Sequence, residues 1–394
     1  MKKVIYSFSL LIAVGSIYHF VSPIQARNIE SPQIKKRVIV TQAINSDAPK
    51  IQVGILLDSS NSMDGLIEQA RTQIWSVINA LDKVKKNDKN PVIEVSLYHY
   101  GNDTLPSSEG FNRMLNELTT DLDLVSENLF SIKTQGGQEY TGWVIDSALK
   151  QLDWSNDSED FRVIFIAGNE TFQQGSVDWQ KAIDAAAKKD VIVNTIYCGK
   201  SESPDSSLWA TAANAGKGSY FNLNQDKVIV SIPTPYDDEI ARLNRELNQT
   251  YLPYGARGQV SRGRQSAQDS NAFNSSNRSA GYNRVLSKVS GSYRNSSWDL
   301  VDAVRDNTID LNTIDKNLLP ENMRSLTVPE IRQQVADMAQ KRAALRAKII
   351  KLGQKRAEYI AKNTPKQDVD KTLDSLMISA LYQQLAAKGF EIKK

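Results

Sequence analysis

The residues whose types and spacing could do chemistry lie in the loop Asp58-Ser-Ser60-Asn-Ser62. One carboxylate and two hydroxyls at steps of two are hard oxygen donors, which suit Mg²⁺, Mn²⁺ or Ca²⁺ and not a soft metal. Two neutral hydroxyls leave such an ion short of negative charge, so a partner's carboxylate could complete its coordination shell. The alternative is ordinary helix capping by Ser60 or Ser62, with Asp58 favoured by the helix dipole.

The segments around this loop predict the elements that position it. An apolar run over residues 50–58 ends in the aspartate, which is typical of a buried central strand, and residues 63–85 follow with helical spacing. Further strands are predicted at residues 92–100, 161–167, 191–197 and 218–223, and further helices at residues 141–152, 177–189 and 208–215. Strands that alternate with helices indicate a doubly wound, mostly parallel sheet, here with a short antiparallel edge strand at residues 114–119.

The predicted α/β domain spans residues 48–232, and its order of elements resembles the von Willebrand factor type A domain. The most specific match is Asp58-x-Ser60-x-Ser62 between a strand and a helix, as in the family's metal-ion-dependent adhesion site. A second match is the run Gly-Gly-Gln-Glu-Tyr-Thr-Gly ending at Gly142, where the family often has Gly-Gly-Thr-x-Thr-Gly. The resemblance implies a Rossmann-like fold and a binding module that holds Mg²⁺, or Mn²⁺ or Ca²⁺ in its place.

Two loops depart from the family's pattern. Aligning the Thr-Gly pairs puts Glu139 where the metal-binding Thr usually lies, and Gly168 replaces the Asp of the third loop. A glutamate in the second loop would strengthen cation binding but weaken the pull on a partner's carboxylate. The expected metal ligands are Asp58, Ser60, Ser62, Glu139 and Glu170, with Asn169 and Thr141 supporting them.

The amino terminus has the pattern of an export signal. Two lysines precede an apolar run over residues 4–21, so residues 1–26 are predicted to be a signal peptide cleaved after Ala26. An uncleaved membrane anchor is the alternative, because about 18 apolar residues approach the length that spans a bilayer. Residues 27–47 are predicted to be a flexible leader. The near absence of cysteine favours a bacterial protein that is periplasmic, bound to the cell envelope or secreted.

The segment at residues 233–326 is predicted to hold one helix, a linker and docking segments. Apolar residues at helical spacing indicate the helix over residues 236–252, and Trp298 begins an amphipathic docking stretch. Residues 255–281 are rich in Gly, Ser, Asn, Arg and Gln, a composition that predicts a solvated linker.

Residues 327–394 are predicted to form an antiparallel helical hairpin. Its first helix carries a coiled-coil-like apolar stripe in which Arg342 and Arg356 occupy two positions, and its second helix covers residues 368–388. The hairpin either covers the core of its own chain or joins chains into an oligomer.

Composition excludes several classes of function. A net charge of +3 over 394 residues indicates neither a nucleic acid nor an acidic membrane as partner. The one cysteine, Cys198, excludes an intramolecular disulfide and a Cys-rich zinc site. His99 is the one histidine outside the predicted signal, which excludes chemistry that needs several imidazoles. We expect both side chains to be structural.

Three functions fit these residues. The leading hypothesis is an exported binding module, not an enzyme, that recognises a protein or peptide with an exposed acidic group. A scaffold with a degenerate metal site is the alternative, because Gly168 replaces a ligand. A metal-dependent hydrolase is the second alternative, motivated by Glu139 and Glu170, although no nucleophile or oxyanion device can be named beside them.

Overall fold

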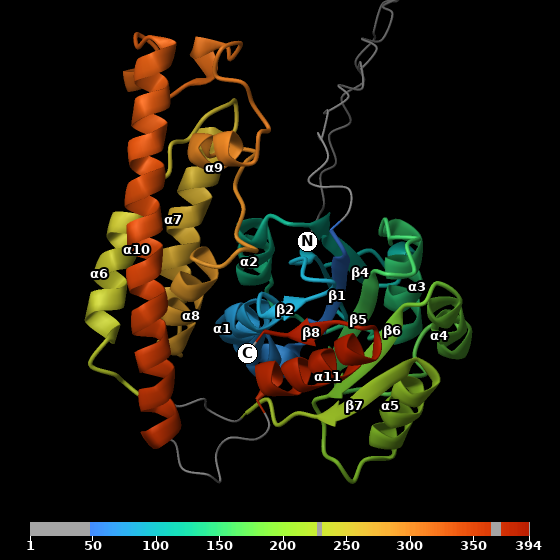
Figure 1. Ribbon diagram of the computed structural model, residues 1–394. Helices are drawn as coiled ribbons and strands as arrows, with labels where there is room; N and C mark the ends of the chain where they lie inside the picture. Colours follow the sequence, from blue (N-terminus) through green and yellow to red (C-terminus); the bar gives the residue numbers. More distant parts are fainter. Residues whose placement is uncertain (1–47, 227–230, 364–371, 394) are drawn as a thin grey trace, which may run out of the picture. The chain divides into compact units, whose positions relative to one another are not determined.

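The computed structural model describes residues 48–226, 231–363 and 372–393 (Figure 1). The predicted signal peptide at residues 1–26 and the leader at residues 27–47 lie outside the described residues. All described residues belong to one compact unit, Ala43–Lys394. Within them, no helix combines the length and the apolar character needed to cross a membrane.

A six-stranded sheet in the order β4-β3-β1-β5-β6-β7 forms the centre of residues 48–226. Its strands are β1 Lys50–Asp58, β3 Val92–Tyr100, β4 Asn112–Thr119, β5 Phe161–Gly168, β6 Ile192–Tyr197 and β7 Lys217–Asn222. β4 runs antiparallel to β3, and the other neighbouring pairs are parallel. The predicted mostly parallel, doubly wound sheet is confirmed, together with its antiparallel edge strand.

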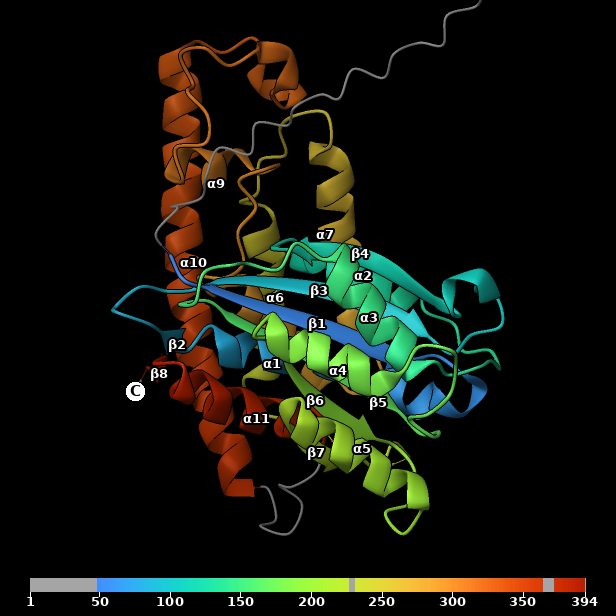
Figure 2. The same ribbon diagram turned by 90° about the vertical axis from the view of Figure 1, so that its right-hand side faces the viewer.

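Helices cover both faces of this sheet (Figure 2). One face carries α1 Asp64–Leu81, α2 Leu122–Ser131 and α11 Leu373–Ala387, and the other carries α3 Thr141–Gln151, α4 Trp179–Lys188 and α5 Pro204–Ala215. Along β1, Ile55 and Leu57 point into the core under α1, and Leu56 between them points into the opposite core. Successive strand residues face opposite ways, so a strand with two covered faces must be apolar throughout, as β1 is.

Helix α11 lies in the same layer as α1, on the same face of the sheet, although about 150 residues separate it from β7. It packs on α1 and β7, and the strand that follows it, β8 Glu391–Ile392, pairs with β2 Val84–Lys85 (Figure 1). Side-chain amides of Gln384 and Asn194 exchange hydrogen bonds of 2.6 and 3.1 Å, which tie α11 to β6. The C-terminal segment is therefore a structural part of the sheet domain.

Between β7 and α11 the chain forms a helical arm. Its helices are α6 Asp237–Asn248, α7 Gly258–Asn274, α8 Ser279–Lys288, α9 Leu300–Arg305 and α10 Val328–Asn363. Short 3-10 helices lie in the sheet domain at η1 Asn61–Met63 and η2 Ser107–Glu109, and in the arm at η3 Lys316–Leu318 and η4 Glu321–Met323.

The predicted pairing of the last two helices is wrong. α10 packs on α6, α8 and α9, whereas α11 packs on α1. The charged positions of the predicted stripe are buried ion pairs: Arg342 Nη1 lies 2.6 Å from Asp299 Oδ2, and Arg356 Nε lies 2.9 Å from Asp237 Oδ1. Because the stripe of α10 is used within the arm, the interpretation that these helices cover their own chain is favoured over an oligomerising coil.

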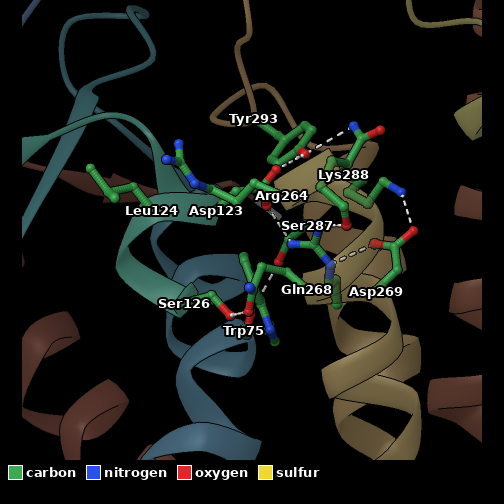
Figure 3. Close-up of polar contacts among 12 residues, drawn as sticks. Trp75, Asp123, Leu124, Ser126, Arg264, Gln268, Asp269, Ser287, Lys288 and Tyr293 are labelled. Atoms are coloured by element: carbon green, nitrogen blue, oxygen red, sulfur yellow. Dashed lines mark hydrogen bonds and ion pairs between the residues drawn. The ribbon is translucent and has the colours of Figure 1, made fainter. Parts of the chain in front are cut away.

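The prediction of a linker over residues 255–281 is also wrong, because α7 and α8 occupy most of it. Their polar residues pair across a buried interface with the sheet domain (Figure 3). Arg284, fully buried, lies 2.7 Å from Asp123 Oδ1 on α2 and 2.6 Å from Asp269 Oδ1 on α7. Lys288 adds a 2.8 Å ion pair to Asp269. Buried polar groups need such partners, so a polar composition here reflects pairing and not solvation.

Candidate metal centre

The candidate site lies where the carboxyl ends of β1 and β5 meet. The chain adds β3 and β4 on one side of β1 and then β5, β6 and β7 on the other, so the order reverses between β1 and β5. Ligands of open α/β sheets bind outside the strand ends at such a switch point. Asp58 ends β1, Asn169 directly follows β5, and Glu139 lies just before α3.

The first loop holds its hydroxyl groups together. Asp58 Oδ1 accepts a 2.7 Å hydrogen bond from the Ser60 N–H, and the hydroxyl oxygens of Ser60 and Ser62 lie 3.2 Å apart. Ser60 precedes η1, yet its side chain makes no capping hydrogen bond, and α1 begins only at Asp64. The helix-capping alternative for Ser60 is therefore not what the structure shows.

The second loop brings Glu139 against Asp58. Glu139 is 3% exposed, and its N–H donates to Gln174 Oε1 at 3.0 Å. Gly101 makes the approach of the two carboxyl groups possible: it has φ +73°, and a Cβ there would lie 2.6 Å from Asp58 Oδ1 and 2.9 Å from Glu139 Cγ. Thr141 donates its hydroxyl to the Phe172 carbonyl at 2.9 Å, which places it in support of the loop.

The surroundings of the third loop explain why Gly168 stands in place of the family's usual aspartate. A Cβ on Gly168 would lie 2.5 Å from the Tyr100 hydroxyl and 3.3 Å from Asp58 Cβ, so no larger side chain fits. Asn169 instead donates from Nδ2 to the Ser62 hydroxyl at 3.0 Å. Glu170 is exposed, and its Oε2 accepts a 2.7 Å hydrogen bond from Gln174. Of the two candidates in this loop, Asn169 directly contacts the serine cluster.

Three oxygens of this site lack a hydrogen-bond donor. Asp58 Oδ2, Glu139 Oε2 and Asn169 Oδ1 are buried and have no hydrogen-bond partner. A proton on Glu139 would be shared with Asp58. No cluster of three His, Cys, Asp or Glu occurs among the described residues, so a metal here would need hydroxyl and amide oxygens in addition to the carboxylates of Asp58 and Glu139. Orphaned buried oxygens beside two hydroxyls fit a hard divalent cation.

Burial controls the titration of the two carboxyl groups. It raises the pKa of Asp58 to about 6, with a smaller rise from the charge of Glu170. Burial, and then the charge of Asp58, raise the pKa of Glu139 well above its usual range. Two like charges in one buried place repel each other, and a divalent cation held by Asp58 and Glu139 would offset that repulsion.

Two supporting residues were not singled out from the sequence. Gln174 connects the second and third loops, since it accepts from Glu139 and donates to Glu170. Asn102 donates to the Ser59 carbonyl at 3.2 Å and to the Lys133 carbonyl at 2.9 Å. Asn102 follows the end of β3, so its place at a third parallel strand end was a signal that could have identified it.

His99 and Cys198 are buried, as expected for structural side chains. His99 Nδ1 lies 3.0 Å from the Ser59 hydroxyl, and burial lowers the pKa of His99 to about 4. Burial also raises the pKa of the Cys198 thiol, which keeps it protonated and unreactive.

The raised pKa values predict how metal and pH affect stability. Because the folded-state pKa of each carboxyl group lies above its unfolded value, their neutral forms stabilise the metal-free protein below about pH 4. That stability is lost as the pH rises through about 6 for Asp58 and higher still for Glu139. Mg²⁺ should therefore raise the melting temperature more at pH 8 than at pH 5, where protons compete with the ion.

Replacing Glu139 distinguishes its contribution to metal binding from that of Asp58. The pKa of Glu139 is about 10, so in the metal-free protein at pH 8 this side chain still holds its proton; Glu139→Gln should therefore change the metal-free melting temperature little and should lose most of the Mg²⁺-induced rise. Glu170→Gln, at an exposed position, is the control and should change little. Differential scanning calorimetry of the three proteins is the measurement. An equal Mg²⁺ effect in wild type and Glu139→Gln would contradict the assignment.

A family model and several solved structures match part of this chain. Residues 52–233 match the family model of the von Willebrand factor type A domain, and the chain matches no curated protein. Similar solved structures include proximal thread matrix protein 1 from the mussel byssus with a zinc-occupied MIDAS motif, at 12% identity and TM-score 0.36, covering 46% of this chain and 43% of that one. The chain thus spans less than half the length of that protein.

Two further solved structures are similar over a comparable stretch. The SpRpn10 VWA domain is 16% identical with TM-score 0.34, covering 44% of this chain and 88% of that one. The pilus adhesin SpaC from Lactobacillus rhamnosus GG is 12% identical with TM-score 0.34, covering 54% of this chain and 32% of that one.

Proposed function

We propose that this chain, whose residues 52–233 match the family model of the von Willebrand factor type A domain, binds a protein or peptide partner through a divalent cation. Such domains often mediate protein binding and often hold a divalent metal. The cation would be Mg²⁺, or Mn²⁺ or Ca²⁺, because the donors around it are oxygens of carboxylate, hydroxyl and amide groups.

One observation carries this proposal: the buried, unpartnered oxygens of Asp58, Glu139 and Asn169 border the paired hydroxyls of Ser60 and Ser62. Each orphaned buried oxygen costs folding free energy. A bound ion would offset that cost at all three oxygens. We assign Asp58, Ser60, Ser62 and Glu139 as ligands. Asn169 is the third-loop donor in preference to Glu170, whose carboxylate is held by Gln174.

The partner would enter from the solvent side of the ion. Ser62 is exposed, whereas Asp58 and Glu139 lie beneath it. The two carboxylates would balance the charge of a divalent ion, which leaves a moderate attraction for an acidic group of the partner. We therefore propose a protein or peptide that presents an acidic side chain and makes further contacts around the site.

Binding is our proposal in preference to catalysis. A hydrolase that used Asp58 and Glu139 as its carboxylate pair would need them to reach a substrate, and they are 0% and 3% exposed. We further propose that the chain is exported in a bacterium, to the periplasm, the envelope or the medium, on the basis of its first 26 residues. The scaffold alternative, motivated by Gly168, predicts partner binding that needs no ion.

Capture of partners with and without a chelator separates the binding module from the scaffold. Immobilised wild type, Asp58→Ala and Glu170→Gln would be cross-linked to an envelope extract of the source cells, and the captured proteins identified by mass spectrometry. We expect a partner that is lost about 100-fold with EDTA and with Asp58→Ala, and retained with Glu170→Gln; this loss corresponds to about 2.7 kcal/mol. A partner that Asp58→Ala and EDTA leave in place would support the scaffold instead.

A further inference from the structure

Three aromatic side chains gather at the surface beside the second loop of the candidate metal site. Tyr140 directly follows Glu139, Trp143 lies in the first turn of α3, and Phe111 precedes β4. The ring centres of Phe111 and Tyr140 are 5.5 Å apart in an edge-to-face pair. Those of Tyr140 and Trp143 are 6.4 Å apart, with 24° between the ring planes. All three residues are partly exposed, so this aromatic cluster is accessible from solvent.

The backbone around the aromatic cluster is strained and closely packed. Phe111 has φ +49°, in the left-handed region where a bulky residue is an outlier. Gly110, with φ +68°, lies so close to Trp143 that a Cβ there would come within 2.2 Å of ring atom Cδ2. A Cβ on Gly175, with φ +90°, would lie 2.6 Å from Tyr140 Cγ. Backbone strain of this kind concentrates at functional sites, and here it fixes three accessible rings in advance of any contact.

The polar tips of two of these rings have no partner within the part of the chain that the structure describes. Tyr140 Oη and Trp143 Nε1 form no hydrogen bond with a described residue, and neither atom is buried. By contrast, the indole N–H of Trp209 donates to the Glu170 carbonyl at 2.7 Å, and that of Trp154 donates to a backbone carbonyl at 3.0 Å. The aromatic cluster therefore presents two accessible donors beside apolar ring surface.

The aromatic cluster is continuous with the candidate metal site. Gly101, which lies against Glu139, donates its N–H to the Phe111 carbonyl at 3.0 Å. Gln174, the chain neighbour of Gly175, accepts a hydrogen bond from the Glu139 N–H at 3.0 Å. The loops that hold the rings are thus the loops that surround the candidate ligands, so a peptide that reaches the ion would pass over the rings.

An extended segment that contains proline fits this chemistry. A polyproline II segment has no internal hydrogen bonds, so its carbonyl groups are free to accept them. Such segments bind surfaces lined by aromatic rings, and their preset conformation reduces the entropy lost on binding. The segment rises by about 3.1 Å per residue. Because Tyr140 is the chain neighbour of Glu139, a proline one or two residues from the group at the ion would lie near the Tyr140 ring.

We infer that Phe111, Tyr140 and Trp143 bind a proline-containing extended segment of the same partner whose acidic side chain meets the ion. This inference rests on the proposed function and specifies its partner as a segment with an acidic residue flanked by prolines. Tyr140 and Trp143 donate to carbonyl groups of the segment, and Phe111 supports the Tyr140 ring edge-on. The acidic group attaches the partner to the ion, and the aromatic cluster selects among acidic segments.

Peptide titrations in the presence of Mg²⁺ test this selectivity. The first probe is a fluorescent peptide of about nine residues with one central aspartate among prolines. In the second probe glycine and serine replace the prolines, and in the third asparagine replaces the aspartate. Fluorescence anisotropy measures binding to wild type, Trp143→Ala, Phe111→Asn, Tyr140→Phe and the control Tyr359→Ala. Asparagine tolerates the left-handed conformation of position 111, and Tyr359 is an exposed aromatic residue on α10 of the arm.

Wild type should bind the proline–aspartate peptide about ten-fold more tightly than the glycine–serine peptide. Trp143→Ala and Phe111→Asn should lose this preference, because each removes a ring of the cluster. Tyr140→Phe should lose part of it with the hydroxyl donor, and Tyr359→Ala should keep it. Tyr140→Phe retains its ring, so it keeps the test informative if a variant that lacks a ring does not fold.

An aspartate peptide that binds with no preference for proline, or a preference that persists in Trp143→Ala and Tyr140→Phe, would overturn this inference and leave the ion-mediated function intact. A proline preference that Trp143→Ala removes but that EDTA, Asp58→Ala and the asparagine peptide leave unchanged would overturn the ion-mediated function instead. Tighter binding of maltohexaose than of the proline–aspartate peptide would assign the aromatic cluster to a sugar and overturn the inference. A wild type that binds none of the peptides would contradict both.

Discussion

Deleting residues 372–394 is expected to unfold the sheet domain. Leu373, Met377, Leu381 and Leu385 of α11 are buried in the same core as Ile55 of the central strand. Full burial of such a side chain contributes about 1.5–3 kcal/mol, so losing four removes about as much free energy as a whole domain retains. Circular dichroism should show no cooperative melting transition, and the shortened protein should aggregate through its exposed apolar face.

A shorter deletion is the control. Removing residues 391–394 takes away the exposed strand β8 and the two lysines after it, and should lower the melting temperature by a few degrees at most. The matched family segment ends at residue 233, so a chain cut there would also lack α11 and should fail to fold. A cooperative transition near the wild-type temperature for the chain that ends at residue 371 would show that α11 is dispensable.

Replacing Arg284 by Met should cost about 3–5 kcal/mol, because the substitution leaves Asp123 and Asp269 in a buried place without their shared cation. Lys288 still pairs with Asp269, so Asp123 is the carboxylate that should be left without a cationic partner. The guanidinium also lies 4.7 Å from the centre of the Trp75 ring on α1, and the substitution removes that contact between the arm and the sheet domain. Urea denaturation followed by tryptophan fluorescence measures the loss.

Arg264→Met is the matched control on the neighbouring helix α7. Arg264 also pairs with two carboxylates, Asp121 and Glu127, but these are 34% and 46% exposed, so its loss should cost about 1 kcal/mol or less. Adding Asp123→Asn to Arg284→Met should restore part of the stability, because it removes the unpaired charge. Equal costs for Arg284→Met and Arg264→Met would contradict the role of burial.

Hydrophobic periodicity was sufficient to predict the sheet. The run from Lys50 to Asp58 is apolar because both of its faces are covered, and the strand and helix that follow alternate as βαβ units must. The position of the first candidate metal loop followed directly, since a carboxylate at a parallel strand end lies at the edge of the sheet where ligands of such folds bind.

The remaining features depend on contacts between residues distant in sequence. The polar composition of α7 resembles that of a linker until its Asp269 is known to pair with Arg284, which also contacts Asp123, 161 residues away. The partner of α11 is α1, about 300 residues earlier, and not the neighbouring α10. The reason for Gly168 is the Tyr100 hydroxyl on another strand. No local sequence pattern indicates these contacts.

The most direct test of the account is calorimetric titration of the full chain with Mg²⁺, Mn²⁺ and Ca²⁺, repeated for Asp58→Ala and Glu139→Gln. Ion binding at the ends of β1 and β5 predicts one ion per wild-type chain with at least one of the three. Asp58→Ala should give no measurable binding and Glu139→Gln about ten-fold weaker binding or worse, which is about 1.4 kcal/mol. Wild-type titrations without heat at several temperatures, or Asp58→Ala binding as wild type does, would contradict the account.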